Sequence, residues 1–163
     1  KSVETDRSIY PRNGYQPKGG GFERDFMSGV LNNSAGVLAF AKLDRRHKLK
    51  IAYRDETGIL RNYEIDFIVK TSDKMYLVET KADKDIAIPN VAVKVQAANA
   101  WCEQASLVSL SEDVRQPQEW EYLILSEGLY KSNKGLSFEA FIPLCRGLRD
   151  NIVAKAKNQL FLL

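Results

Sequence analysis

The clearest pattern of apolar and polar positions lies in residues 63–81. Two apolar runs flank a short polar break, and this pattern is typical of two strands joined by a hairpin turn. With Ser72 and Asp73 as the central residues of the turn, the strands pair antiparallel and Phe67 lies opposite Val78. The register matters, because a slip of one residue would send every side chain of a strand to the other face.

The same register places Asp66 opposite Glu79. Directly opposed residues have Cβ atoms about 4.5–5.5 Å apart, and like charges at that separation destabilise a hairpin. Such a pair suggests a cation between the two carboxylates, since hard divalent cations take carboxylate oxygens as ligands. Lys81 lies two residues beyond Glu79, so the strand period of two puts both side chains on the same face.

Apolar positions outside the hairpin predict further helices and strands. They are expected at residues 22–32 and 91–104 for helices, and at residues 37–42, 51–53 and 120–126 for strands. The run at 37–42 also fits the end of a helical hairpin. Ser137 is the predicted cap of another helix, which Pro143 is expected to kink or break. Residues 82–90 and 127–135 are polar and are expected to be loops.

These elements predict an α/β fold, with a mixed central β-sheet flanked by helices on both faces. The first residues are polar and rich in Gly, Pro and Asn, so residues 1–21 are expected to form an extended N-terminal arm. Tyr10 and Tyr15 are candidates to pin this arm to the body. Residues 22–163 are expected to form one domain, and the start at Lys1 rather than Met suggests a fragment of a larger chain.

Composition narrows the class of protein. The chain has 163 residues, no apolar run near the roughly 20 residues of a membrane helix and no secretory signal pattern, so we expect a cytoplasmic protein with no membrane partner. Cys102 and Cys145 lie in apolar surroundings, which favours buried free thiols over a disulfide. The net charge of +3 permits nucleic-acid binding, and the basic residues 45–50 are either a phosphate contact or a solvated face.

Asp66 and Glu79 are the predicted ligands of Mg²⁺, which usually takes one or two carboxylates and keeps several waters. The ion would lower the pKa of a bound water and polarise a phosphoryl oxygen. Lys81 would orient that water or stabilise the charge of the transition state. These roles point to metal-dependent hydrolysis of a phosphodiester. The spacing of these three residues alone is equally consistent with a ladder of surface ion pairs on an ordinary hairpin.

The residues Ile65-Asp66 and Glu79-Thr80-Lys81 resemble the active-site motif of the PD-(D/E)XK nuclease superfamily, except that Ile65 replaces the usual proline. The predicted order helix, three strands, helix, strand (αβββαβ) is similar to the restriction-endonuclease-like core of that superfamily. More narrowly, the chain resembles the C-terminal endonuclease domain of the restriction subunit of type III restriction–modification enzymes. That resemblance rests on the segments 10–15, 20–26, 51–55, 63–69 and 77–81 and on Lys94 with Trp101 and Cys102.

The resemblance implies a site with three catalytic residues, a further metal ligand and an accessory residue from the following helix. These are Asp66, Glu79 and Lys81, then Glu23, then Lys94 or Gln96. Asp66 and Glu79 would bind Mg²⁺, for which Mn²⁺ is a candidate substitute, while Lys81 acts on the water. From its position alone, Glu23 also fits a solvated acid in the first turn of a helix.

The function implied by the resemblance is Mg²⁺-dependent cleavage of double-stranded DNA. The implied partners are an ATP-dependent helicase or translocase domain in the same chain and a methyltransferase subunit that supplies specificity. This chain has no phosphate-binding Gly-x-x-x-x-Gly-Lys-Ser/Thr sequence, so the motor would lie upstream. Two alternatives remain open, a non-catalytic nucleic-acid-binding module of the same fold and a nuclease of repair or RNA processing.

Overall fold

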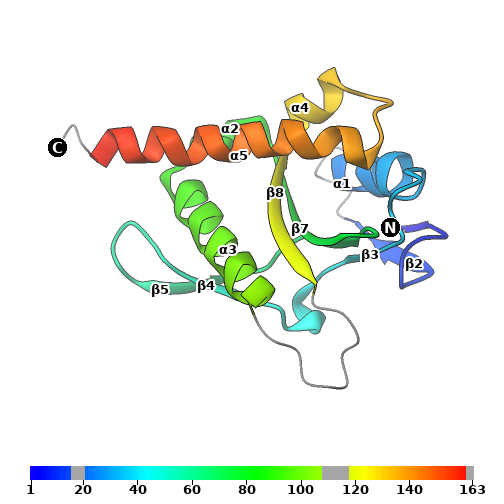
Figure 1. Ribbon diagram of the computed structural model, residues 1–163, viewed down its shortest axis with the longest axis horizontal. Helices are drawn as coiled ribbons and strands as arrows, with labels where there is room; N and C mark the ends of the chain where they lie inside the picture. The colour runs from blue at the N-terminus through cyan, green and yellow to red at the C-terminus, as the bar shows by residue number, and fades with distance from the viewer. Residues whose placement is uncertain (16–20, 108–117, 161–163) are drawn as a thin grey trace.

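A four-stranded mixed sheet lies at the centre of the protein (Figure 1). The computed structural model describes residues 1–15, 21–107 and 118–160. The sheet has the order β3-β6-β7-β8, formed by Ala39–Lys42, Phe67–Lys70, Lys74–Lys81 and Glu119–Ser126. Strand β6 is antiparallel to both β3 and β7, whereas β8 runs parallel to β7. The sheet is therefore mixed, as the sequence predicts.

The hairpin formed by β6 and β7 has the predicted register. Phe67 pairs with Val78, and the Thr71 N–H donates to the Lys74 carbonyl across a distance of 2.9 Å, which closes the turn at Ser72 and Asp73. The first strand is shorter than predicted, because Tyr63 ends a separate strand and β6 begins only at Phe67.

Helices cover both faces of this sheet. The first is α1 (Phe22–Asp25), which continues as the π-helix η2 (Phe26–Leu31), and the others are α2 (Asp83–Ile86), α3 (Pro89–Leu107), α4 (Glu127–Ser132) and α5 (Phe138–Leu160). Tyr76 and Val78 of β7 pack in the cluster that contains η2, α4 and the start of α5, whereas Leu77 packs on the side of α3. Successive side chains of β7 thus point to opposite faces of the sheet and pack in two separate hydrophobic cores.

Two predictions about local structure are wrong, and of the two alternatives for Pro143 the break is excluded. The segments expected to be loops at 82–90 and 127–135 contain α2 and α4, and Ser126 starts α4 by accepting a hydrogen bond from the Leu129 N–H at 3.1 Å. Pro143 does not break α5, which runs as one helix from Phe138 to Leu160. Its early residues are anchored in the core by Phe138, Phe141 and Cys145, and this packing outweighs the backbone hydrogen bond that proline removes.

Two small hairpins and one turn lie outside the central sheet. Strands β4 (Ile51–Arg54) and β5 (Leu60–Tyr63) form one hairpin, and β1 (Ser2–Glu4) and β2 (Arg12–Gly14) form the other. Figure 1 shows these hairpins on opposite sides of the molecule. The turn is the short 3₁₀-helix η3 (Arg45–His47), which follows β3.

The described part of the N-terminal arm is attached to the body, as expected, although residues 16–20 of the arm lie outside the described residues. The Ile9 N–H donates to the Phe40 carbonyl at 2.9 Å, and the Phe40 N–H donates to the Arg7 carbonyl at 3.0 Å, so the arm pairs with β3. The Tyr10 hydroxyl lies 3.1 Å from His47 Nε2, and Tyr15 packs against the core. Both tyrosines therefore pin the arm.

Cys102 and Cys145 are buried free thiols, as expected. Burial raises the pKa of each thiol to about 12, so both are protonated at neutral pH. No helix in the described ranges has the length and apolar character needed to cross a membrane.

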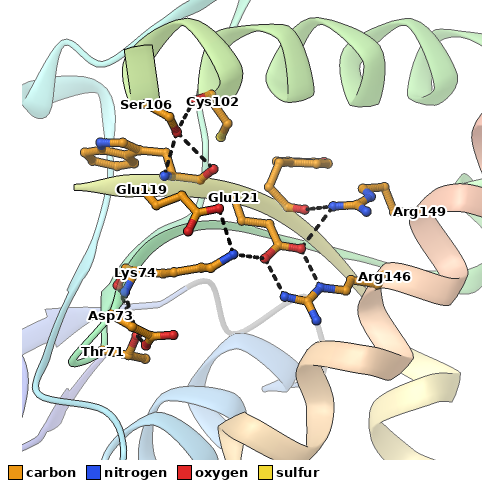
Figure 2. Close-up of polar contacts among 11 residues, drawn as sticks. Thr71, Asp73, Lys74, Cys102, Ser106, Glu119, Glu121, Arg146 and Arg149 are labelled. Atoms are coloured by element: carbon orange, nitrogen blue, oxygen red, sulfur yellow. Dashed lines mark hydrogen bonds and ion pairs between the residues drawn. The ribbon is translucent and has the colours of Figure 1, made fainter. Parts of the chain in front are cut away.

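A half-buried carboxylate holds α5 on the edge strand β8 (Figure 2). Glu121 accepts two hydrogen bonds of 2.6 Å from Arg146 and one of 3.3 Å from Arg149, and Lys74 lies 3.8 Å away. Burial raises the pKa of Glu121, but the hydrogen bonds from Arg146 and the surrounding positive charges outweigh it and lower the pKa overall. Charge-assisted bonds with this forked geometry are among the stronger polar contacts.

Replacing Glu121 with Ala is expected to lower the free energy of unfolding by about 1.5–3 kcal/mol, because two guanidinium groups lose a charged acceptor. Glu119→Ala is the matched control on the same strand. Its carboxylate is 63% exposed and pairs with Lys74, so its removal should cost about 0–1 kcal/mol. Urea unfolding of the three proteins measures both values, and equal losses would show that Glu121 has no special role.

Candidate active site

The predicted site residues gather where β6 begins and β7 ends. Asp66 directly precedes β6, while Glu79 and Lys81 lie at the end of β7, which is antiparallel to it. Glu23 comes from α1 and Lys94 from α3. The antiparallel register brings Asp66 together with Glu79 and Lys81, whereas Glu23 and Lys94 are contributed by helices that pack on the sheet.

Two hydrogen bonds from one residue hold the Asp66 carboxylate in place. Its Oδ2 atom accepts from the Thr80 N–H and from the Thr80 hydroxyl, both at 2.7 Å. Burial raises the pKa of Asp66, and the charge of Glu23 adds to the rise, while the bonds from Thr80 and the charge of Lys42 oppose it. Asp66 is therefore tied to the end of β7 and close to a second acid.

Glu79 is a buried carboxylate with an incomplete set of partners. The residue is 8% exposed, and Lys81 Nζ lies 3.5 Å from its Oε1 atom. Its Oε2 atom is buried and has no hydrogen-bond partner among the described residues. Burial, followed by the charge of Asp66, raises the pKa of Glu79 to about 8, although Lys81 and Lys94 oppose this rise. A cation at this position would relieve both the burial and the repulsion.

Glu23 is paired with Lys42, a residue that sequence reasoning missed. Lys42 Nζ lies 2.9 Å from Glu23 Oε2 and 5.0 Å from the centre of the Phe67 ring. The Oε2 atom is nevertheless buried without a well-directed hydrogen bond in the described part of the chain. Lys42 pairs with Phe67 across β3 and β6. This pairing joins residues far apart in the chain, so no local sequence pattern could have identified Lys42.

The two accessory candidates occupy different places. Lys94 lies near the acids, with Nζ at 5.5 Å and 5.6 Å from the ring centres of Tyr53 and Tyr63. Burial and the charge of Lys81 lower the pKa of Lys94, whereas Glu79 raises it. Gln96 is exposed and lines a separate hollow between α3 and α5. The structure therefore places Lys94 beside the site and Gln96 outside it.

A cleft of about 160 Å³ opens at this end of the sheet, and its lining includes Tyr15, Glu23, Thr80 and Lys81. Within the described ranges, no three His, Cys, Asp or Glu side chains stand in an arrangement ready to hold a metal ion. The donor set still fits a hard cation, because Glu79 Oε2 is buried without a hydrogen-bond partner among the described residues and Asp66 lies near both Glu79 and Glu23. Glu23 Oε2 is held by Lys42 at 2.9 Å, so it would have to exchange this ion pair for the metal. Lys42 and Lys81 supply the positive charge that these acids contact.

Comparison with known proteins adds no assignment: no family model, no curated protein and no solved structure matches the chain.

The raised pKa of Glu79 makes the stability of the protein depend on pH. The folded state keeps a proton on Glu79 that the unfolded chain loses near pH 4.5, so the free energy of unfolding should fall as the pH rises from 4.5 to about 8. Glu79→Gln removes this titration. In metal-free buffer the variant should therefore be more stable than the wild type at pH 8, by a few kcal/mol at about 1.4 kcal/mol per pKa unit.

Thermal unfolding at about pH 5 and at pH 8 measures this effect, and the advantage of Glu79→Gln should nearly vanish at the lower pH. Glu56→Gln removes an exposed carboxylate and serves as the control, with little change expected at either pH. An advantage of the same size at both values would show that Glu79 does not carry the titration.

Proposed function

We propose that this chain is a nuclease domain that hydrolyses DNA phosphodiester bonds with Mg²⁺. One observation carries the proposal: Glu79 is buried with an unpartnered oxygen, close to Asp66 and next to the ammonium of Lys81. Burying like charges together is costly unless another charge compensates them. A site that bears this cost is more simply explained by cation binding than by a surface ladder of ion pairs.

Asp66, Glu79 and Glu23 would hold the ion, and Mn²⁺ is a candidate substitute. When bound, Mg²⁺ supplies a water of lowered pKa and a Lewis acid for a phosphoryl oxygen. The bonds from Thr80 fix the position of Asp66, so little rearrangement is needed on that side. Lys81 would orient the attacking water or stabilise the added negative charge of the transition state. Lys94 would lie beside the ion as an accessory residue. Burial and the charge of Lys81 lower the pKa of Lys94, so its ammonium gives up a proton more readily than that of a free lysine.

The finer assignment proposed is the endonuclease domain of a type III restriction–modification enzyme, with a restriction-endonuclease-like core. It is supported by the motifs around Asp66 and Glu79 and by the mixed sheet that carries them. The corresponding partners are double-stranded DNA, an ATP-dependent motor and a methyltransferase subunit. A non-catalytic DNA-binding module and a nuclease of another pathway are the outcomes to be separated by experiment.

Plasmid cleavage with Mg²⁺ tests the proposed activity. Asp66→Asn and Lys81→Ala are expected to reduce cleavage at least about 100-fold, since each removes a group that acts on the metal, the water or the developing charge. Asp73→Asn is the control, because Asp73 is an exposed acid in the turn of the same hairpin. Equal cleavage by all four proteins would reject the assigned site.

Metal binding gives a second test that does not depend on the motor. Mn²⁺ and Ca²⁺ should raise the unfolding temperature of the wild type and of Asp73→Asn, and this shift should be lost in Asp66→Asn and Glu79→Gln. A ligand at 100 times its Kd stabilises a protein by about 2.7 kcal/mol, which calorimetry readily detects. DNA binding without any metal-dependent shift would favour the non-catalytic module.

A further inference from the structure

A groove of about 720 Å³ adjoins the candidate active site, between the N-terminal hairpin and η3. Its lining includes Lys42, and it shares Tyr15 and Glu23 with the cleft of about 160 Å³. A ligand that extends beyond the cleft in this direction must therefore pass along the groove. The volume lies within the roughly 300–1,000 Å³ of typical ligand sites.

Basic side chains outnumber acidic ones along this groove. Four basic residues, Lys1, Arg12, Lys42 and Arg46, face two acids, Glu23 and Asp44. Two of the basic residues are themselves paired with acids: Arg46 contacts Asp44 at 2.6 Å, with the Arg46 N–H donating to it at 2.9 Å, and Arg12 contacts Glu4 at 3.0 Å. The contacts with Arg46 lower the pKa of Asp44. The exposed Arg45 and Lys48 extend the positive charge along the same turn.

Both arginines of the walls can reach a ligand. The side chain of Arg12 is 75% exposed and that of Arg46 is 87% exposed, and each is paired with one surface acid. Exposed ion pairs contribute little to stability, so a guanidinium can exchange its carboxylate for a phosphate without unfolding the wall. Arginine binds phosphate through two parallel N–H donors, and this geometry suits the backbone of a nucleic acid.

Hydrogen bonds hold the two walls in a fixed relation. His47 Nδ1 accepts from the Asp44 N–H at 2.9 Å, which leaves the hydrogen on Nε2 to be donated to the Tyr10 hydroxyl at 3.1 Å. On the other wall, the buried Asn13 donates to Thr5 at 3.1 Å and to the Tyr10 carbonyl at 3.0 Å. Tyr10 thus links β2 to η3, and the groove is formed before any ligand binds.

We propose that this groove holds the sugar–phosphate backbone of the DNA strand on one side of the scissile phosphate, with Arg12 and Arg46 as phosphate contacts. The proposal rests on the proposed nuclease function and adds a binding surface to it. The basic side chains of the groove lining suit the phosphates of a nucleic-acid backbone, which carry no sequence information themselves.

The test is the binding of a fluorescent DNA duplex, followed by anisotropy in Ca²⁺ over a series of salt concentrations. Arg12→Ala/Arg46→Ala should weaken binding roughly 10- to 30-fold near physiological salt. The slope of log K against log salt should fall by about 0.9 for each phosphate contact that is lost. Unfolding temperatures of all variants are measured in parallel and should stay close to that of the wild type.

Arg61→Ala is the matched control. Arg61 is also an exposed arginine paired with an aspartate, since it lies 2.9 Å from Asp55 and its side chain is 55% exposed. It belongs to β5, on the opposite side of the molecule from the N-terminal hairpin (Figure 1). Arg61→Ala should keep the affinity and the salt slope of the wild type.

Three outcomes would contradict the proposed DNA-binding groove: no DNA binding by the wild type, an unchanged salt slope in the double variant, or an equal loss of affinity in Arg61→Ala. The proposal would also be contradicted if an acidic peptide bound as tightly as DNA and if the same variants lost that binding. Asp66→Asn separates the two proposals. If it binds DNA but no longer cleaves it while the groove variants bind normally, the nuclease stands and the groove fails. If it cleaves like the wild type while the groove variants lose binding, the groove stands and the active site assigned to Asp66 fails.

Discussion

The pair of hydrogen bonds from Thr80 to Asp66 is the contact on which the site depends. It joins the start of β6 to the end of β7, just beyond the last paired residues, Phe67 and Val78. A slip of one residue would remove both bonds and turn Glu79 to the other face. The register is therefore fixed by the turn at Ser72 and Asp73, by the alternation of side chains along β7 and by the bonds to Asp66. The same register holds Asp66 and Glu79 close together inside the protein.

Bringing acids together has an electrostatic cost that this fold offsets with lysines. Lys42 contacts Glu23 and Lys81 contacts Glu79, while Lys94 acts on Glu79 from the neighbouring helix. The three lysines come from β3, β7 and α3, so the compensation requires the sheet and its covering helix to be assembled. The compensation is incomplete, since burial still raises the pKa of Asp66 and of Glu79. That residual cost is what a bound cation would remove.

The remainder of the fold supports this end of the sheet from two sides. On one edge, Glu121 of β8 binds Arg146 and Arg149 of α5 and so fixes the long helix against the parallel strand pair (Figure 2). On the other edge, backbone hydrogen bonds pair residues 7–9 of the N-terminal arm with β3, the strand that carries Lys42. The arm therefore covers an edge that would otherwise expose unpaired backbone groups, and it also forms a wall of the groove beside the acids.

The sequence by itself determined the β6–β7 register, the same-face placement of Glu79 and Lys81, and the helix that carries Lys94, because turns and residue periods are local properties. It missed α2 and α4 and the separate strand β5, where short polar segments gain structure from neighbouring contacts. Only the tertiary structure decided that Lys42 reaches Glu23 and that Gln96 lies away from the acids. Both follow from the pairing of β3 with β6 and the packing of α3 on the sheet, contacts between residues far apart in the chain that no local pattern records.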